Sequence, residues 1–82
     1  MIIKYPLSTE KAIRLMESEN KLVFIVEDKA KKQDIKKAIE ETFKVKVAAI
    51  NTINDFRGRK KAYVRLAPES PAIDLATKLG LM

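Results

Sequence analysis

The part of this sequence best suited to chemistry is a run of cations around a glycine. Arg57, Arg59, Lys60 and Lys61 place four positive charges within five residues. Cations held this close repel one another, and a polyanion relieves the repulsion, because phosphates accept paired hydrogen bonds from arginine. Binding of this kind releases counterions, so its affinity falls with salt. A second interpretation stays open, since basic residues also protect a sheet edge from pairing with another chain.

The net charge of the chain is concentrated around that run. Residues 44–65 contain seven basic side chains and one acid, Asp55, and therefore account for the whole net charge of +6. The ten basic and ten acidic residues elsewhere cancel. One positive face on a neutral domain favours a polyanionic partner, either a nucleic acid or an anionic membrane surface. The membrane is the weaker candidate, because no predicted helix pairs a basic face with large exposed apolar residues.

Polar and aromatic side chains flank the run. Tyr63 is suited to stacking on a base or ribose, although a tyrosine at this position also serves to cover a sheet. Asn51, Thr52 and Asn54 can bind ribose hydroxyls or phosphates, and a plain solvent face before a turn is the alternative.

A separate group of lysines precedes and enters a predicted helix. We interpret it as a solvated helix face, because Lys36 can pair with Glu40, and Lys37 with Glu41, four residues on. The competing interpretation is a second basic strip for a polyanion. The four lysines are Lys31, Lys32, Lys36 and Lys37.

The sequence lacks the groups that most enzymes use. It contains no cysteine and no histidine, which removes disulfides, thiolate metal sites and the usual acid–base group. Ser8 and Ser70 are expected to cap helices, and Gly58 and Gly80 to form a turn and a helix stop. We expect no enzymatic activity, cofactor, metal or small-molecule substrate. The lack of a long apolar segment or a secretory signal predicts a cytoplasmic protein.

Hydrophobic patterning predicts one α+β domain over residues 1–82. A short strand at residues 2–5 is followed by a helix over residues 9–17, with Ser8 as N-cap and Asn20 as left-handed terminator. The next strand, residues 21–27, is apolar on both faces, which predicts a central place in the sheet.

The second half of the chain continues with a helix and a hairpin. An apolar stripe predicts a helix over residues 32–43. Strands at residues 45–54 and 61–66 are joined by a turn in which Gly58 supplies a positive φ. Ser70 and Pro71 are expected as N-cap and first-turn proline of a last helix that Gly80 ends. The order is therefore β, α, β, α, β, β, α.

Four motifs in this order resemble the ribosomal large-subunit protein twenty-three family. They are residues 8–12 (STEKA), 35–47 (IKKAIEETFKVKV), 50–52 (INT) and 60–64 (KKAYV). The resemblance extends over nearly the whole chain. The brief connection at residues 55–60 and the ending DLATKLG at residues 74–80 are similar to the short archaeal form.

The resemblance implies a ribonucleoprotein role. Members bind large-subunit rRNA at the rim of the polypeptide exit tunnel, next to ribosomal protein twenty-nine, and dock factors that receive nascent chains. Their fold is an antiparallel four-stranded sheet with packed helices. Its elements follow the order β-(α)-β-α-β-β, which hydrophobic patterning also predicts for this chain. The short turn here departs from the long bacterial hairpin that reaches into the tunnel. Lys31 stands where relatives often have a threonine that caps the second helix.

Charge and resemblance together give two sets of expected site residues. Those expected to bind rRNA are Lys4, Thr9, Lys11, Lys44, Lys46, Asn51, Thr52, Asn54, Arg57, Arg59, Lys60, Lys61 and Tyr63. Those expected to dock signal recognition particle or a translocon, by resemblance, are Ser8, Glu10 and Arg14. The alternative function is a protein-interaction module whose main role is recruiting such factors.

Overall fold

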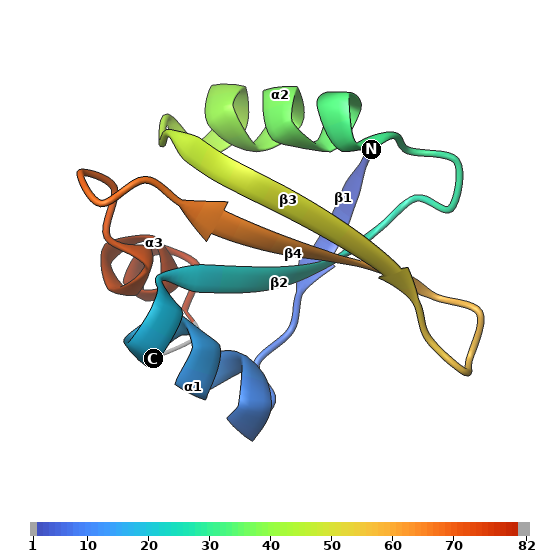
Figure 1. Ribbon diagram of the computed structural model, residues 1–82, viewed down its shortest axis with the longest axis horizontal. Helices are drawn as coiled ribbons and strands as arrows, with labels where there is room; N and C mark the ends of the chain where they lie inside the picture. Colours follow the sequence, from blue (N-terminus) through green and yellow to red (C-terminus); the bar gives the residue numbers. More distant parts are fainter. Residues whose placement is uncertain (1, 81–82) are drawn as a thin grey trace.

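The computed structural model describes residues 2–80 and confirms an α+β fold with seven elements (Figure 1). The elements follow the predicted order. They are β1 (Ile3–Pro6), α1 (Glu10–Glu19), β2 (Lys21–Val26), α2 (Lys32–Phe43), β3 (Val47–Asn54), β4 (Lys60–Leu66) and α3 (Ala72–Lys78).

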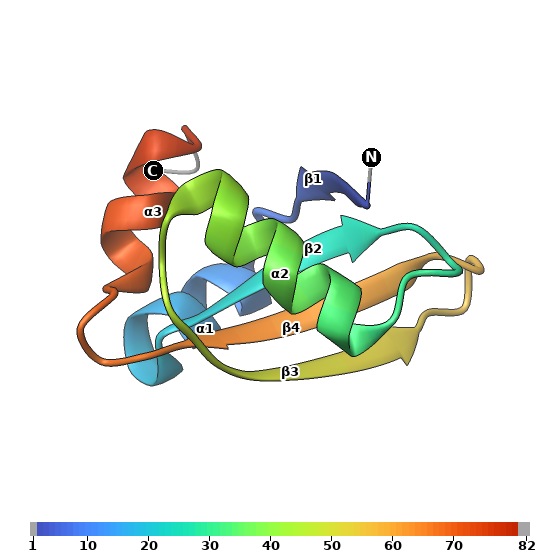
Figure 2. The same cartoon turned by 90° about the horizontal axis from the view of Figure 1, so that it is seen from above.

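The four strands form one antiparallel sheet in the order β1-β2-β4-β3. Helix α2 crosses one face of this sheet, and α1 lies on the opposite side, below β2 (Figure 1). Helix α3 packs at the end of the sheet where β2 begins and β4 ends (Figure 2). Both faces of the sheet therefore carry helices, and strands β3 and β4 are covered mainly on the α2 face (Figure 1).

Strand β2 is the centre of the core. All residues from Leu22 to Val26 are buried, which confirms the prediction from its two apolar faces. Phe24 is fully buried and stacks on Phe43 of α2, with ring centroids 5.9 Å apart. Ile35 and Ile39 fill the same interface with no exposed surface. Each such side chain contributes about 1.5–3 kcal/mol through burial, so α2 is bound to the sheet mainly by its apolar stripe.

The predicted start of α1 was wrong by one residue. The N-cap is Thr9, whose hydroxyl accepts a hydrogen bond from the Ala12 N–H at 3.2 Å, while Ser8 lies outside the helix. The helix also runs on to Glu19, two residues beyond its predicted end. Asn20 then adopts the left-handed conformation expected of it, with φ of 56°.

Asn20 also joins the ends of three elements, which the sequence did not reveal. Its amide NH₂ donates to the carbonyl oxygens of Leu66, Ala67 and Ser70, at 3.1–3.2 Å. Its side-chain oxygen accepts from the N–H of Ala72 at 2.6 Å. Asn20 therefore provides the cap for α3 from 52 residues away.

The predicted capping of α3 by Ser70 was consequently wrong. The N-cap position belongs to Pro71, which makes no side-chain hydrogen bond. The hydroxyl of Ser70 instead accepts from the Lys46 N–H at 3.1 Å and ties the start of β3 to the loop before α3. Gly80 follows the helix with φ of 76°, as expected of a helix stop.

Helix α2 has the predicted bounds, but its expected ion pairs do not form. Neither Lys36 with Glu40 nor Lys37 with Glu41 is among the ion pairs of residues 2–80. The Glu40 carboxylate turns inward and accepts from the Val47 N–H at 3.1 Å. This bond holds β3 to the helix, and β3 begins at Val47, two residues later than predicted.

The Asn20 cluster generates a prediction for stability. Asn20→Gly keeps a residue that favours positive φ and deletes only the side-chain hydrogen bonds. The variant should lose about 2–4 kcal/mol of unfolding free energy, because several partly buried polar groups lose their partners. Urea denaturation measures the loss. Thr9→Ala is the matched control, with an expected loss of about 1 kcal/mol for one cap. Equal losses in the two variants would contradict the linking role of Asn20.

Candidate nucleic-acid interface

Strand β4 separates apolar from polar side chains between the two faces of the sheet. Ala62, Val64 and Leu66 face α2 and are buried. The alternate residues of β4 face the other way, because successive side chains point to opposite faces of a strand. Together with their neighbours on β3, they form what we call the open sheet face: Asn51, Ile53, Lys61, Tyr63 and Arg65.

The register brings the predicted residues of the open sheet face together in pairs. Asn51 lies directly opposite Tyr63, and Ile53 opposite Lys61. On the other side of β4, Tyr63 lies opposite Val23, which is only 4% exposed. Tyr63 thus covers an apolar residue while staying partly exposed, which leaves both of its predicted roles possible.

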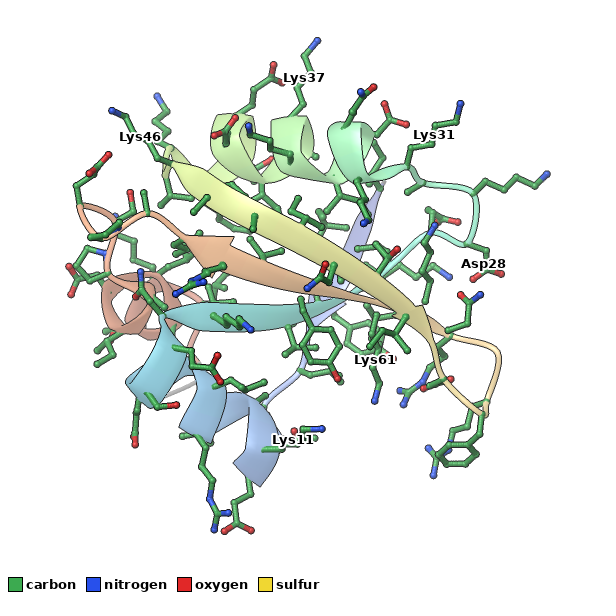
Figure 3. The ribbon with its side chains drawn as sticks, in the orientation of Figure 1. Lys11, Asp28, Lys31, Lys37, Lys46 and Lys61 are labelled. Carbon is green, nitrogen blue, oxygen red and sulfur yellow. The ribbon has the colours of Figure 1, made fainter. Side chains whose placement is uncertain are left out.

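A shallow pocket joins the open sheet face to the start of α1. Thr9 and Lys11 line it from the helix, and Lys61 and Tyr63 line it from β4. Its lining also includes apolar residues, among them Val23. Figure 3 shows Lys11 and Lys61 on the same side of the sheet, away from Lys31 and Lys37. The fold therefore collects four of the expected rRNA-binding residues from two distant segments.

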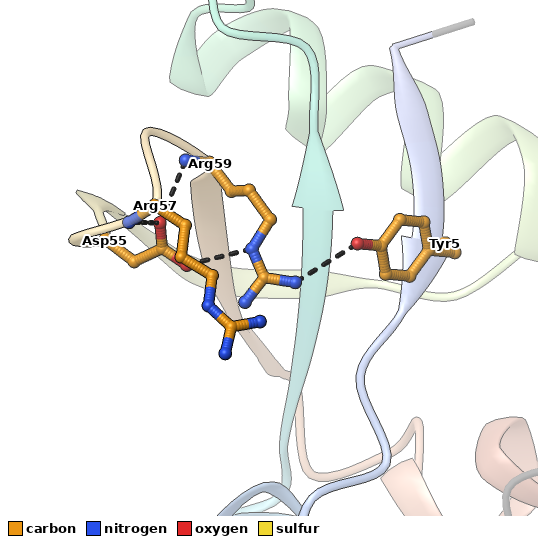
Figure 4. Close-up of polar contacts among 4 residues, drawn as sticks. All are labelled: Tyr5, Asp55, Arg57 and Arg59. Atoms are coloured by element: carbon orange, nitrogen blue, oxygen red, sulfur yellow. Dashed lines mark hydrogen bonds and ion pairs between the residues drawn. The ribbon is translucent and has the colours of Figure 1, made fainter.

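The hairpin between β3 and β4 is organised by Asp55 (Figure 4). One carboxylate oxygen accepts from the N–H groups of Arg57 and Arg59, each at 2.9 Å. The other accepts from Arg59 Nε at 3.0 Å. The guanidinium of Arg59 also donates to the Tyr5 hydroxyl at 3.2 Å, across 54 residues of sequence. The turn and the edge strand β1 are thereby connected.

These contacts stabilise the charged forms of both groups. The Asp55 side chain is only 6% exposed, and this desolvation opposes ionisation. Hydrogen bonds from the backbone and guanidinium of Arg59, and from the Arg57 N–H, outweigh it and lower the pKa of Asp55. The Tyr5 hydroxyl and then the Asp55 carboxylate raise the pKa of Arg59.

Two cations of the predicted run are therefore already satisfied within the protein. Arg59 is held by Asp55, and the ammonium of Lys60 donates to the carbonyl oxygens of Ala30 and Asp28, at 2.6 and 3.4 Å. Asp55 supplies a counter-charge for Arg59, so the expectation that a polyanion relieves the repulsion is wrong for this residue, whereas neutral carbonyl oxygens hold Lys60 without cancelling its charge. Among residues 2–80, the side chains of Arg57 and Lys61 have no hydrogen-bond or ion-pair partner.

The remaining expected rRNA-binding residues lie away from the open sheet face. The register places Thr52 and Asn54 on the α2 face, with Lys60 opposite Asn54. Lys4 lines an apolar groove between β1 and α2. Lys44 ends α2, and Lys46 pairs with Glu69 at 3.5 Å, at the opposite end of β3 from the hairpin. The structure does not bring this second group into one surface with the first.

The expected factor-docking residues lie at the beginning of α1. Glu10 and Arg14 form an ion pair at 2.8 Å, and both side chains are more than three-quarters exposed. Ser8 is exposed just before the helix. These three residues form one small surface that is separate from the hairpin tip.

Sequence reasoning missed three residues that belong beside the site. Arg65 shares the open sheet face, and its alternation with Lys61 and Tyr63 was a usable signal. Tyr5 gave no local signal, because its partner Arg59 is distant in sequence. Phe56, an apolar residue between Asp55 and Arg57, stands 91% exposed at the hairpin tip.

Two further observations concern sites of other kinds. Within residues 2–80, no group of three or more acidic residues is placed to hold a metal ion. None of the three helices in this range is long and apolar enough to cross a membrane.

The sheet thus has one face packed against α2 and one face that carries polar and basic side chains. The chain belongs to the ribosomal protein L23 family, whose model matches residues 1–57. The large ribosomal subunit protein uL23 of Tetrahymena thermophila is 48% identical over 81 residues, covering 99% of this chain and 54% of the relative. The chain thus spans about half the length of the curated relative that it matches. These findings confirm the family resemblance.

The Asp55 contacts generate a prediction for pH dependence. A carboxylate whose pKa is lower in the folded protein stabilises it at neutral pH, and this stabilisation is lost as pH falls through the folded pKa. Asp55→Asn should therefore reduce the acid sensitivity of the unfolding free energy between about pH 2 and pH 6. Chemical denaturation at several pH values measures it. Asp74→Asn, at an exposed acid of α3, is the control. Identical pH profiles for Asp55→Asn and the parent protein would contradict the conclusion that folding lowers the pKa of Asp55.

Proposed function

We propose that this chain is a structural constituent of the large ribosomal subunit that binds large-subunit rRNA through the open sheet face and the hairpin tip. Family membership supports the ribosomal role, and the matched relative is a large-subunit protein by name. We place its work in the cytoplasmic ribosome, at the rim of the exit tunnel beside ribosomal protein twenty-nine. Its part there is structural rather than enzymatic.

The observation that carries the proposal is the arrangement of unpaired cations and stacking groups on one side of the sheet. Lys61 and Arg57 have no partner among residues 2–80 and lie toward the hairpin end of β4. Tyr63 and Asn51 lie next to each other on the same face as Lys61. Cations that hold phosphates beside a tyrosine and an amide that contact ribose or base are a common RNA-binding arrangement.

The engaged cations take a different role in this proposal. Arg59 and Lys60 fix the turn and the loop before α2, so they position the surface rather than supply its main charge. Lys44 and Lys46 lie at the far end of β3, where they provide a second and independent contact with RNA. Removing a cation on the open sheet face should therefore cost more affinity than removing Lys46.

This difference is testable with two matched substitutions. Lys61→Gln should weaken binding to large-subunit rRNA and reduce the slope of log affinity against log salt by about 1, as expected for one lost phosphate contact. Lys46→Gln, which removes a lysine already paired with Glu69, should change both quantities less. Filter binding at several salt concentrations measures them. An unchanged slope for Lys61→Gln would remove the open sheet face from the interface.

A second function is supported by the exposed ion pair on α1. Glu10 and Arg14 present a fixed pair of opposite charges away from the hairpin, which suits a docking contact for a targeting factor. We propose that signal recognition particle or a translocon contacts Ser8, Glu10 and Arg14. This role is compatible with rRNA binding because none of these three residues lines the pocket between α1 and β4.

Charge reversal tests the docking role. Glu10→Lys should weaken factor recruitment to ribosomes several-fold, because it places two like charges together beside the partner. It should leave incorporation into subunits intact. Glu17→Lys, an equal charge change elsewhere on α1, is the control. Co-sedimentation of the factor with ribosomes measures recruitment, and normal recruitment by Glu10→Lys would exclude Glu10 from the contact.

A further inference from the structure

Phe56 is the most exposed of the large apolar side chains in the described part of the protein. It is 91% exposed, compared with 54% for Ile53, the next in rank. Covering an exposed aromatic ring with a partner removes a large apolar surface from water and is favourable. The position of Phe56 at the tip of the β3–β4 hairpin makes it the first part of that hairpin to meet a partner.

The turn holds Phe56 in a defined place. The Gly58 N–H donates to the Asp55 carbonyl at 3.1 Å, and the Asp55 N–H donates to the Arg59 carbonyl at 2.8 Å. Gly58 takes φ of 78°, the left-handed conformation that closes a three-residue hairpin loop. Phe56 and Arg57 therefore occupy the two outermost positions of a well-bonded turn. Binding through them costs little conformational entropy, because the backbone is already ordered.

Arg57 places a charged group next to the Phe56 ring. Its guanidinium carbon lies 5.3 Å from the centroid of Phe56, a cation–π distance. Figure 4 shows this guanidinium pointing away from the Asp55 and Arg59 contacts. With Phe56 almost fully exposed, the tip offers an uncovered aromatic surface next to an unpaired cation.

We propose that Phe56 and Arg57 form a stacking site for one unpaired RNA base, with Phe56 packing on the base and Arg57 binding a neighbouring phosphate. The inference rests on the proposed rRNA-binding function and adds a specific contact to it. A base has an aromatic face for the ring, and its backbone supplies the negative charge that Arg57 lacks within the protein.

An apolar pocket of another protein fits this tip less well. Such a pocket would bury Arg57 together with Phe56, and a buried cation without a partner is costly. Asp55, the acid of the turn itself, is already held by Arg59. Positive charge around the tip therefore favours a ligand that is both aromatic and anionic.

The experiment uses the lack of tryptophan in this chain. Phe56→Trp introduces a single tryptophan that keeps the aromatic ring and reports stacking by fluorescence quenching. Titration with purified large-subunit rRNA should quench this fluorescence, and a fully paired RNA duplex should quench it less. Phe56→Ala should weaken rRNA binding about 5-fold or more with no change in salt slope, since no charge is lost. Phe56→Trp should retain parental affinity.

Controls separate this inference from the proposed function. Ile73→Ala truncates another exposed apolar side chain, on α3, and should leave binding unchanged. Parental affinity of Phe56→Ala without quenching of Phe56→Trp would overturn the stacking site, and the proposed function would survive if Lys61→Gln still weakened binding. The stacking site would also be overturned if large subunits assembled with Phe56→Ala lost a neighbouring protein while the affinity of this variant for rRNA stayed at the parental value.

Discussion

One-sided burial of strand β4 is the constraint on which the rest of this structure depends. The apolar stripe of α2 requires a dry surface, and β2 and β4 supply it through residues such as Phe24 and Val64. Because side chains alternate along a strand, a buried face on β4 sends Lys61 and Tyr63 to the other side. Only part of that side is covered by α1. The packing that stabilises the fold therefore also presents the polar surface that we propose for RNA.

Charge in the hairpin is divided between structure and binding. Arg59 donates to a carboxylate and Lys60 donates to backbone carbonyl oxygens within the protein. These contacts stabilise the turn. Arg57 and Lys61 have no such partner among residues 2–80 and remain available to an anion. A count of positive charge in the sequence treats these four as equivalent. Their contacts separate the residues that shape the surface from those that can bind at it.

Local signals in the sequence predicted most elements correctly, and two of the errors have a common cause. The bounds of α2 follow from its helical stripe, and Gly58 and Asn20 adopt the positive φ expected of them. The cap of α3 was predicted wrongly because Asn20, distant in sequence, takes the place expected of Ser70. Glu40 likewise bonds the backbone of β3 instead of a lysine one turn away. In each case a tertiary hydrogen bond replaced a local one that the sequence also allowed.

The sequence by itself determined the fold class, the strand and helix order, the absence of cysteine and histidine, and the concentration of charge in residues 44–65. These follow from periodicity and composition, which are local properties. Tertiary structure alone decided which of the charged residues share a surface. Strand register sets Asn51 beside Tyr63 and sends Thr52 to the other face, and the contacts of Arg59 with Asp55 and with Tyr5 of β1 engage that cation within the protein. Pairing between distant segments fixes such positions, and no local pattern encodes it.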